Sequence, residues 1–117
     1  MKCERLDVWK RSCRLSVNVY KTFSDSKDFG FKDQITRSAL SIASNIAEGL
    51  EKESNKEKAR FIEIAKGSAA ELITQTYIGI EIDYVAKQEG LAWVKELNEI
   101  LRMLSGLKQS YLTENKC

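Results

Sequence analysis

The chain has 117 residues, of which 43% are hydrophobic and 31% charged, the balance of a single soluble globular domain. The formal net charge of +2 is too small to indicate a nucleic-acid partner by itself. Histidine is absent, which excludes Ser–His and Cys–His nucleophile pairs and di-iron sites of the Glu-x-x-His type. Proline is absent too, so nothing prevents long uninterrupted helices.

No run of about 18 apolar residues occurs, so we expect no membrane span. The opening residues MKCERLDVWKRSCR lack the apolar core of a secretory signal, which favours a cytoplasmic location. Cys3, Cys13 and Cys117 cannot all pair within one chain, and free thiols in a reducing cytoplasm are favoured over a disulfide. The cysteines also lack zinc spacing and there is no phosphate-binding G-x-x-x-x-G-K-[ST] loop, so no metal and no cofactor are expected.

The first predicted helix spans residues 7–23, with Asp7 as a candidate N-cap. Its expected core-facing row recurs at intervals of three or four and consists of Trp9, Cys13, Ser16, Tyr20 and Phe23. The polar stretch SDSKDFG, residues 24–30, predicts a loop. The second helix is predicted over residues 32–50, with Gly49 as a candidate C-terminal stop.

The third predicted helix follows a capping box formed by Ser54 and Glu57 and spans residues 55–85. KQEG interrupts the pattern, and the fourth helix is predicted over residues 91–112. Four amphipathic helices with short connections predict an all-α fold, an antiparallel up-down-up-down four-helix bundle that forms one domain, residues 1–117.

The third helix carries two apolar rows about 110° apart, and the first helix repeats this feature more weakly. Either each helix contacts two neighbours inside the bundle through a wide apolar arc, or the extra row meets another subunit. Exposed contiguous apolar surface is uncommon in monomers, and tyrosines suit interfaces, so we favour self-association. The candidate oligomer interface is then Val8, Leu15, Val19, Ile62, Ile73, Tyr77, Ile80 and Tyr84.

Polar residues in the stretch SIASNIAEG, residues 41–49, form an ordered row on the second helix. One interpretation makes Glu48 and Glu71 a carboxylate pair for acid–base work or magnesium binding. We prefer a structural interpretation, because buried polar groups need hydrogen-bonding partners and can fix helix register. The predicted structural polar network comprises Arg37, Ser41, Asn45, Glu48, Ser68, Glu71 and Gln75.

Basic residues form a stripe on the first helix at Lys10, Arg14 and Lys21, with Arg11 beside it. In one subunit a solvated helix face is the simpler interpretation. In a ring-shaped oligomer symmetry multiplies the patch, and the copies together could bind phosphates through counterion release. These four residues are the candidate nucleic-acid face.

The segments QITRSA, SIASNIAEG and RFIEIAKGSAAEL together resemble the bacterial family of 23S rRNA intervening sequence proteins. The resemblance extends from LDVWK to the last helix. The motif positions are Arg37, Ser41, Asn45, Glu48, Gly49, Phe61, Ala65, Gly67, Ser68, Glu71 and Leu72. The resemblance implies a small antiparallel bundle that assembles into a ring, typically of five subunits. The accessory variability protein of diversity-generating retroelements is similar, and in that branch a basic pentamer binds the reverse transcriptase and nucleic acid.

These observations predict a non-enzymatic, cytoplasmic homo-oligomer that acts as a binding or scaffold module. Its expected partners are further copies of itself and structured RNA or an RNA-processing protein, with no membrane. The alternative is a protein-binding adaptor with no nucleic-acid role.

Overall fold

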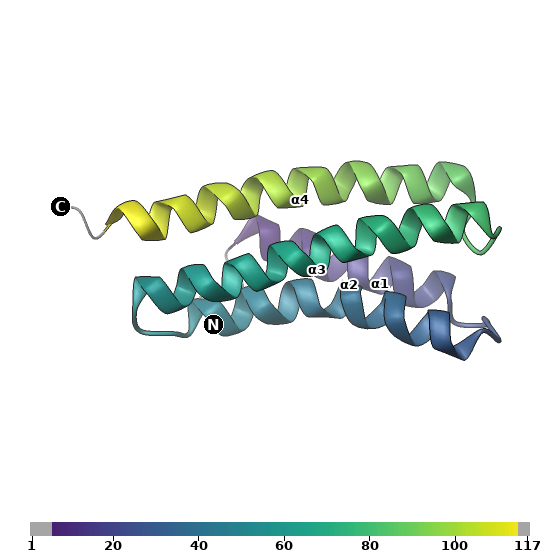
Figure 1. Ribbon diagram of the computed structural model, residues 1–117, viewed down its shortest axis with the longest axis horizontal. Helices are drawn as coiled ribbons and strands as arrows, with labels where there is room; N and C mark the ends of the chain where they lie inside the picture. Colours follow the sequence, from purple (N-terminus) through teal and green to yellow (C-terminus); the bar gives the residue numbers. More distant parts are fainter. Residues whose placement is uncertain (1–5, 115–117) are drawn as a thin grey trace.

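The computed structural model describes residues 6–114, and over this range it contains four α-helices and no β-strand. The helices are α1 (Asp7–Thr22), α2 (Phe29–Leu50), α3 (Asn55–Glu81) and α4 (Lys87–Glu114). They lie side by side along a common long axis, and the α1–α2 and α3–α4 connections lie at the same end (Figure 1). The described part of the chain measures 51 × 21 × 21 Å. The predicted all-α fold with four helices is confirmed.

Side-chain caps fix the starts of α2 and α3. The Asp28 carboxylate accepts a hydrogen bond from the backbone N–H of Phe31 at 3.1 Å, so α2 begins three residues earlier than predicted. The Ser54 hydroxyl oxygen accepts the corresponding bond from the Glu57 N–H at 3.1 Å, as the capping box predicts. Polar residues of the connections therefore determine where both helices start.

The start of α1 differs from the prediction. Its N-cap residue is Leu6, which makes no side-chain capping bond, and Asp7 lies in the first turn of the helix. Asp7 still contributes there, because a carboxylate near a helix N-terminus interacts favourably with the unpaired N–H groups. Two of the three predicted thiols, Cys3 and Cys117, lie outside the described residues, and Cys13 is half-buried on α1.

The third helix ends at Glu81, four residues before the predicted boundary. Asp83 adopts a left-handed backbone conformation with φ of 64°. The Tyr84 N–H then donates to the Gly79 carbonyl at 2.8 Å and the Asp83 N–H donates to the Ile80 carbonyl at 3.1 Å. This pair of bonds is a Schellman motif, which stops the helix without needing glycine because aspartate tolerates the conformation.

The KQEG stretch, predicted as a break, is the first turn of α4. Its glycine serves packing. A Cβ atom at Gly90 would lie 2.6 Å from the Ile80 side chain, so the absence of a side chain lets α4 approach α3 at this end. The glycine that suggests a turn in the sequence therefore marks a close helix contact.

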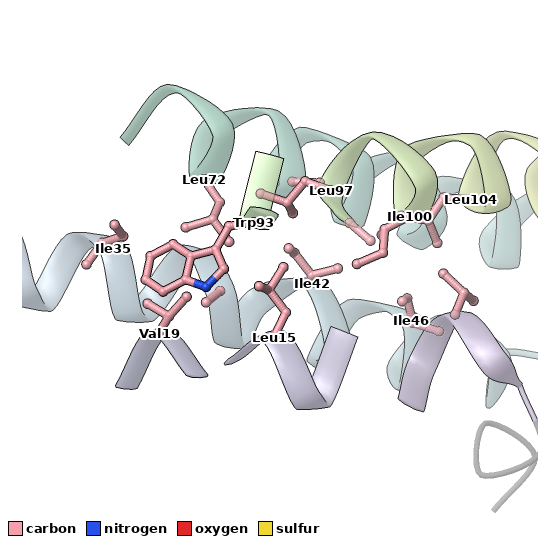
Figure 2. Close-up of a cluster of buried hydrophobic side chains, with 14 of the residues drawn as sticks. Leu15, Val19, Ile35, Ile42, Ile46, Leu72, Trp93, Leu97, Ile100 and Leu104 are labelled. Carbon is pink, nitrogen blue, oxygen red and sulfur yellow. The ribbon is translucent and has the colours of Figure 1, made fainter. Parts of the chain in front are cut away.

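All four helices contribute to one hydrophobic core. Figure 2 shows side chains from every helix converging there, including Leu15 of α1, Ile42 of α2, Leu72 of α3 and Trp93 of α4. Each fully buried side chain of this size stabilises the fold by about 1.5–3 kcal/mol relative to an exposed one. Further members with no exposed surface are Val19, Ile35, Ile46, Ile62, Leu97, Ile100 and Leu104.

Four residues predicted to lie at a subunit interface belong to this core instead. Val8, Leu15 and Val19 of α1 and Ile62 of α3 have at most 4% of their surface exposed. Side chains buried within one chain cannot contact another subunit, so this part of the interface prediction is wrong. The physical reason is that α3 packs against both α2 and α4, and α1 against α2 and α4, which requires a wide apolar arc.

The other four residues of the predicted interface differ in how far they are buried. Ile73 and Ile80 are partly buried against the same core. The Tyr84 ring packs on Phe31, with centroids 5.5 Å apart, so its contacts are with residues of the same chain at one end of the bundle. Tyr77 keeps 49% of its surface exposed. The second row of α3 is thus mostly a contact within the chain.

Close contact between α2 and α3 depends on Gly49. A Cβ atom there would lie 2.8 Å from the Phe61 Cβ and 3.3 Å from the Lys58 carbonyl oxygen, closer than ordinary van der Waals contact. The helix α2 ends at Leu50, as predicted, but no described glycine has a positive φ, so Gly49 is not the expected left-handed stop. Gly49 is required by packing.

Replacing Gly49 with alanine should lower the free energy of unfolding by about 1–3 kcal/mol, because the clash outweighs the better helix propensity. Gly67→Ala is the matched control, since its Cβ would meet nothing within 4 Å on the same pair of helices. That substitution should raise stability by up to about 1 kcal/mol. Urea unfolding followed by circular dichroism measures both, and changes of the same sign would contradict the packing role of Gly49.

Candidate binding surfaces

The predicted polar network forms a seam between α2 and α3. The hydroxyl oxygens of Ser41 and Ser68 lie 2.8 Å apart and share a hydrogen bond. The Asn45 amide donates to the Ser41 backbone carbonyl at 2.8 Å and lies 2.9 Å from the Ser41 hydroxyl. Small side chains allow this approach, so these three residues of the predicted network are brought together inside one chain.

Glu71 joins the seam through a residue that the sequence analysis does not single out. The Ser38 hydroxyl donates to the Glu71 carboxylate at 2.9 Å and also lies 3.1 Å from the Gln34 carbonyl. Ser38 is buried, with 4% of its surface exposed. Its position one turn before Ser41, on the flank of the apolar arc, is the signal that identifies it.

Arg37 and Glu48 are not part of the seam. Arg37 pairs with Asp33 along α2, with its Nε 2.9 Å from the carboxylate, and the Arg37 side chain is 77% exposed. Glu48 is exposed and lies ten residues beyond Ser38 on α2, a rise of about 15 Å, so it forms no carboxylate pair with Glu71. For these two residues the network prediction is wrong, because neither forms a hydrogen bond with the described residues of the seam.

Gln75 is the remaining member of the predicted network. Its amide oxygen is buried and accepts no hydrogen bond from any described residue. Within residues 6–114 no three His, Cys, Asp or Glu side chains are grouped so as to hold a metal ion. The seam carries hydrogen-bond donors in Asn45 and its serines and acceptors in Glu71 and Gln75.

Two open cavities lie over this seam. One has a volume of about 400 Å³ and is lined by Asp33, Gln34, Arg37, Ser38, Ser41 and Glu71. The second, about 430 Å³, is lined by Asp28, Gly30, Phe31, Gln34, Gln75 and Ile78. Gln34 lines both, so the two adjoin along the α2–α3 side of the bundle.

The candidate nucleic-acid face on α1 is only partly available. The Arg11 guanidinium donates to the Glu96 carboxylate of α4 at 2.8 and 2.5 Å and lies 3.3 Å from that of Glu99. This pairing raises the pKa of Arg11 and holds the pKa of Glu96 below its ordinary value of 4.5. Arg11 thus connects α1 to α4, and its charge is already paired with carboxylates of this chain.

The other three basic residues of this face remain open to solvent. Lys10, Arg14 and Lys21 are exposed on α1, and none of them forms an ion pair with another described residue. At 100° per residue they occupy one outward strip of the helix.

An apolar groove lies beside that strip, between α1 and α2. Its volume is about 390 Å³, and Lys21 is the one charged residue in its lining. The most exposed apolar side chains here are Val17 and Leu40 at 49% and Tyr20 at 44%. Tyr20 and Cys13 belong to the row predicted to face the core. Phe23 and Ser16 of the same row are buried as predicted, so this row is divided between the core and the groove. The neighbouring row of Val8, Leu15 and Val19 also belongs to the core.

The fold and these surfaces define a four-helix all-α protein with a basic, an apolar and a polar face. Residues 4–106 match the family model of the 23S rRNA-intervening sequence protein, so the chain belongs to that family. None of its helices, over the described residues, is long and apolar enough to cross a membrane.

One solved structure supports the same grouping. It is the 1.70 Å crystal structure of a protein of unknown function from the S23 ribosomal protein family of Bacteroides thetaiotaomicron VPI-5482. The two structures align with a TM-score of 0.80 and 25% sequence identity, over 86% of this chain and 97% of that chain. No curated protein matches the chain.

The Arg11–Glu96 pair predicts a pH-dependent stability. A carboxylate whose pKa is lower in the folded state stabilises the fold at neutral pH, and this contribution is lost as the pH falls through the folded pKa. The free energy of unfolding of the wild type should be higher than that of Glu96→Gln by about 1 kcal/mol at pH 7, and the difference should be much smaller at pH 3. Urea titrations at both values test this, with Glu53→Gln in the α2–α3 connection as control. A constant difference would contradict the ion-pair interpretation.

Proposed function

We propose that this chain is a non-enzymatic scaffold that assembles as a homo-oligomer and contacts structured RNA through α1. The subunit is an antiparallel up-down-up-down bundle, in keeping with the positions of the three connections (Figure 1). The family name, which refers to a 23S rRNA intervening sequence, supports RNA as the partner class. The five-subunit ring is the assembly that the family resemblance implies.

The outward strip of α1 is the observation that carries the RNA proposal. Lys10, Arg14 and Lys21 are exposed and not neutralised by described carboxylates, whereas Arg11 is paired inside the bundle. Three cations in each subunit become a ring of charge in an oligomer. Such a surface gains affinity for phosphates by releasing counterions, and it reads little sequence.

Reversing all three charges (Lys10→Glu, Arg14→Glu, Lys21→Glu) should abolish binding to a structured ribosomal RNA fragment in a filter assay. The matched control reverses Lys56, Lys87 and Lys95, which are exposed on α3 and α4, and so changes net charge equally. Wild-type affinity should fall steeply between about 50 and 200 mM salt. Affinity that is independent of salt, or equal losses in the two triple variants, would contradict the assignment to α1.

For the assembly, the apolar groove between α1 and α2 is the surface that supports self-association best. Val17, Tyr20 and Leu40 each expose more than 40% of their surface there, and a single charged residue lines the groove. A second copy that covers these side chains would remove contiguous apolar surface from water, which favours association at about 25 cal/mol per Å² before the cost of association.

Leu40→Glu should dissociate the oligomer, because assembly would then bury an unpaired carboxylate. Leu91→Glu is the control, since Leu91 is also exposed, at 43%, but lies on α4. Sedimentation velocity over a concentration series measures the mass of each variant. A wild-type chain that remains a monomer at every concentration would refute the assembly, and dissociation by both variants would refute the assignment to this groove.

The second candidate is a protein-binding adaptor with no nucleic-acid role, and the same apolar groove is the observation that favours it. Under that function the α1 charge reversals would leave partner binding intact, whereas Leu40→Glu would remove it. The α1 charge reversals therefore distinguish the two candidates, whereas Leu40→Glu should disrupt both.

A further inference from the structure

The outer side of α3 carries a row of solvent-exposed residues, none of which belongs to the predicted oligomer interface. They step by three or four positions and therefore share one face of the helix and its C-cap. This α3 row consists of Ile64, Gly67, Glu71, Thr74, Ile78 and Ile82. Its three isoleucines keep 41%, 47% and 44% of their surface exposed. Large apolar side chains that recur along one face are typical of an interaction surface.

Gly67 lies within this row and has no packing role inside the chain. Glycine in a helix interior is destabilising relative to alanine. At Gly49, Gly79 and Gly90 a Cβ atom would lie within 3.1 Å of a neighbouring side chain, which explains why glycine is needed there. A Cβ atom at Gly67 would meet nothing within 4 Å. The open space over Gly67 lets a second helix approach α3 closely.

The α3 row and the apolar groove between α1 and α2 carry complementary charges. Glu71 is the one charged residue of the row. It accepts a hydrogen bond from Ser38 and forms no ion pair with the described residues. Lys21 is the one charged residue in the lining of the groove, and it forms no such pair either. Each surface thus presents one charge among apolar side chains, and the two charges are opposite in sign.

These two surfaces cannot meet within one chain. Over the described residues α1 contacts α2 and α4 but not α3, so α2 separates the groove from the α3 row. A groove that faced a second groove would bring two cations to the contact and leave both α3 rows exposed. A row that enters the groove of the next copy instead pairs unlike surfaces, and a head-to-tail contact of this kind can close into a ring.

We propose that the α3 row of one subunit lies in the α1–α2 groove of the next, with Glu71 against Lys21 and Gly67 at the closest approach of the helices. This inference rests on the self-association proposed above and names the surface that covers the groove. Lys21 then belongs to the subunit contact, while Lys10 and Arg14 stay outside both surfaces and open to RNA.

Two variants, each with one surface disrupted, test the pairing by sedimentation velocity. Ile78→Glu disrupts the α3 row and Leu40→Glu disrupts the groove, so each alone should be a monomer where the wild type is assembled. Mixed in equal amounts, they retain one intact row and one intact groove and should form a complex of two chains. Assembly of Ile78→Glu to the wild-type mass, or a mixture without a two-chain species, would overturn the proposal.

Tyr77→Glu is the matched control for Ile78→Glu. Tyr77 is the neighbouring residue on α3, it is 49% exposed, and it lies outside the α3 row. This variant should assemble like the wild type. Loss of assembly in both variants would overturn the assignment to the row.

Charge exchange tests the contact between Glu71 and Lys21. Glu71→Lys should weaken association by about tenfold or more, because two cations would then face each other. Adding Lys21→Glu reverses both charges and should restore most of the lost affinity. The control adds Lys21→Glu to Glu53→Lys, a charge reversal at an exposed residue of the α2–α3 connection, and should remain weak. Equal affinities of the two double variants would overturn the contact.

Gly67→Gln and Gly106→Gln test the close approach. Both glycines are exposed with open space around a Cβ atom, but Gly106 lies on α4. Glutamine forms helices better than glycine, so both variants should unfold at higher urea concentration. Only Gly67→Gln should weaken association, by about tenfold or more, because its side chain fills the space needed by the neighbouring helix. Equal affinities would overturn the proposed geometry.

The results distinguish the α3 row from the functions proposed above. A wild-type chain that is a monomer at every concentration refutes the assembly itself, whereas an assembled wild type with an assembled Ile78→Glu variant refutes only the row. Lys10→Glu combined with Arg14→Glu should weaken RNA binding and leave the assembly intact. Loss of assembly in that variant would place the basic strip in the subunit contact and overturn the proposed arrangement.

Discussion

The close approach of α2 and α3 is the constraint on which the rest of the structure depends. Gly49 allows it at one end of the pair, where any Cβ would meet Phe61, and the paired hydroxyls of Ser41 and Ser68 allow it in the middle. With larger side chains at these positions the two helices would separate, and the seam between them would be lost. The Gly90 contact with Ile80 extends the same principle to α3 and α4.

This packing also decides how the outer surface is divided. Because the seam uses small polar residues, the flank of α2 that faces α3 is lined with acceptors, while the flank that faces α1 carries Ala43 and Leu40. Lys10 and Arg14 lie outside both, and Lys21 borders the apolar groove. The three surfaces are therefore chemically distinct although they share neighbouring helices.

The sequence predicts the four helices well, because an apolar period of 3.6 residues, sustained over long segments, is typical of amphipathic helices and of no other regular structure. It predicts their ends less well. The start of α2 depends on the Asp28 side chain, and the end of α3 depends on a left-handed Asp83, neither of which periodicity detects. Periodicity identifies both apolar rows of α1, but predicting which members of each row are buried requires knowing which neighbours the helix has.

The polar network also shows that periodicity alone does not determine which way a side chain turns. Ser41, Asn45, Ser68 and Glu71 come together as expected, because their spacing places them on facing flanks. The prediction fails for Arg37, since a residue at the border of an arc can turn either way and Asp33 one turn earlier offers a partner. Ser38 escapes prediction because a serine beside apolar neighbours resembles a tolerated core residue.

The two ends of the molecule are secured very differently. At one end the Schellman motif closes α3, the Tyr84 hydroxyl donates to Asp28 at 2.8 Å, and the rings of Phe23, Phe31 and Tyr84 pack against one another. By contrast, α1 starts at Asp7, and its N-cap residue Leu6 makes no side-chain capping bond. Local opening should begin at that uncapped first turn, where amide protons would exchange with solvent before those around the aromatic cluster. Lys10 lies in this more labile segment, so the basic strip should be less rigid at Lys10 than at Lys21.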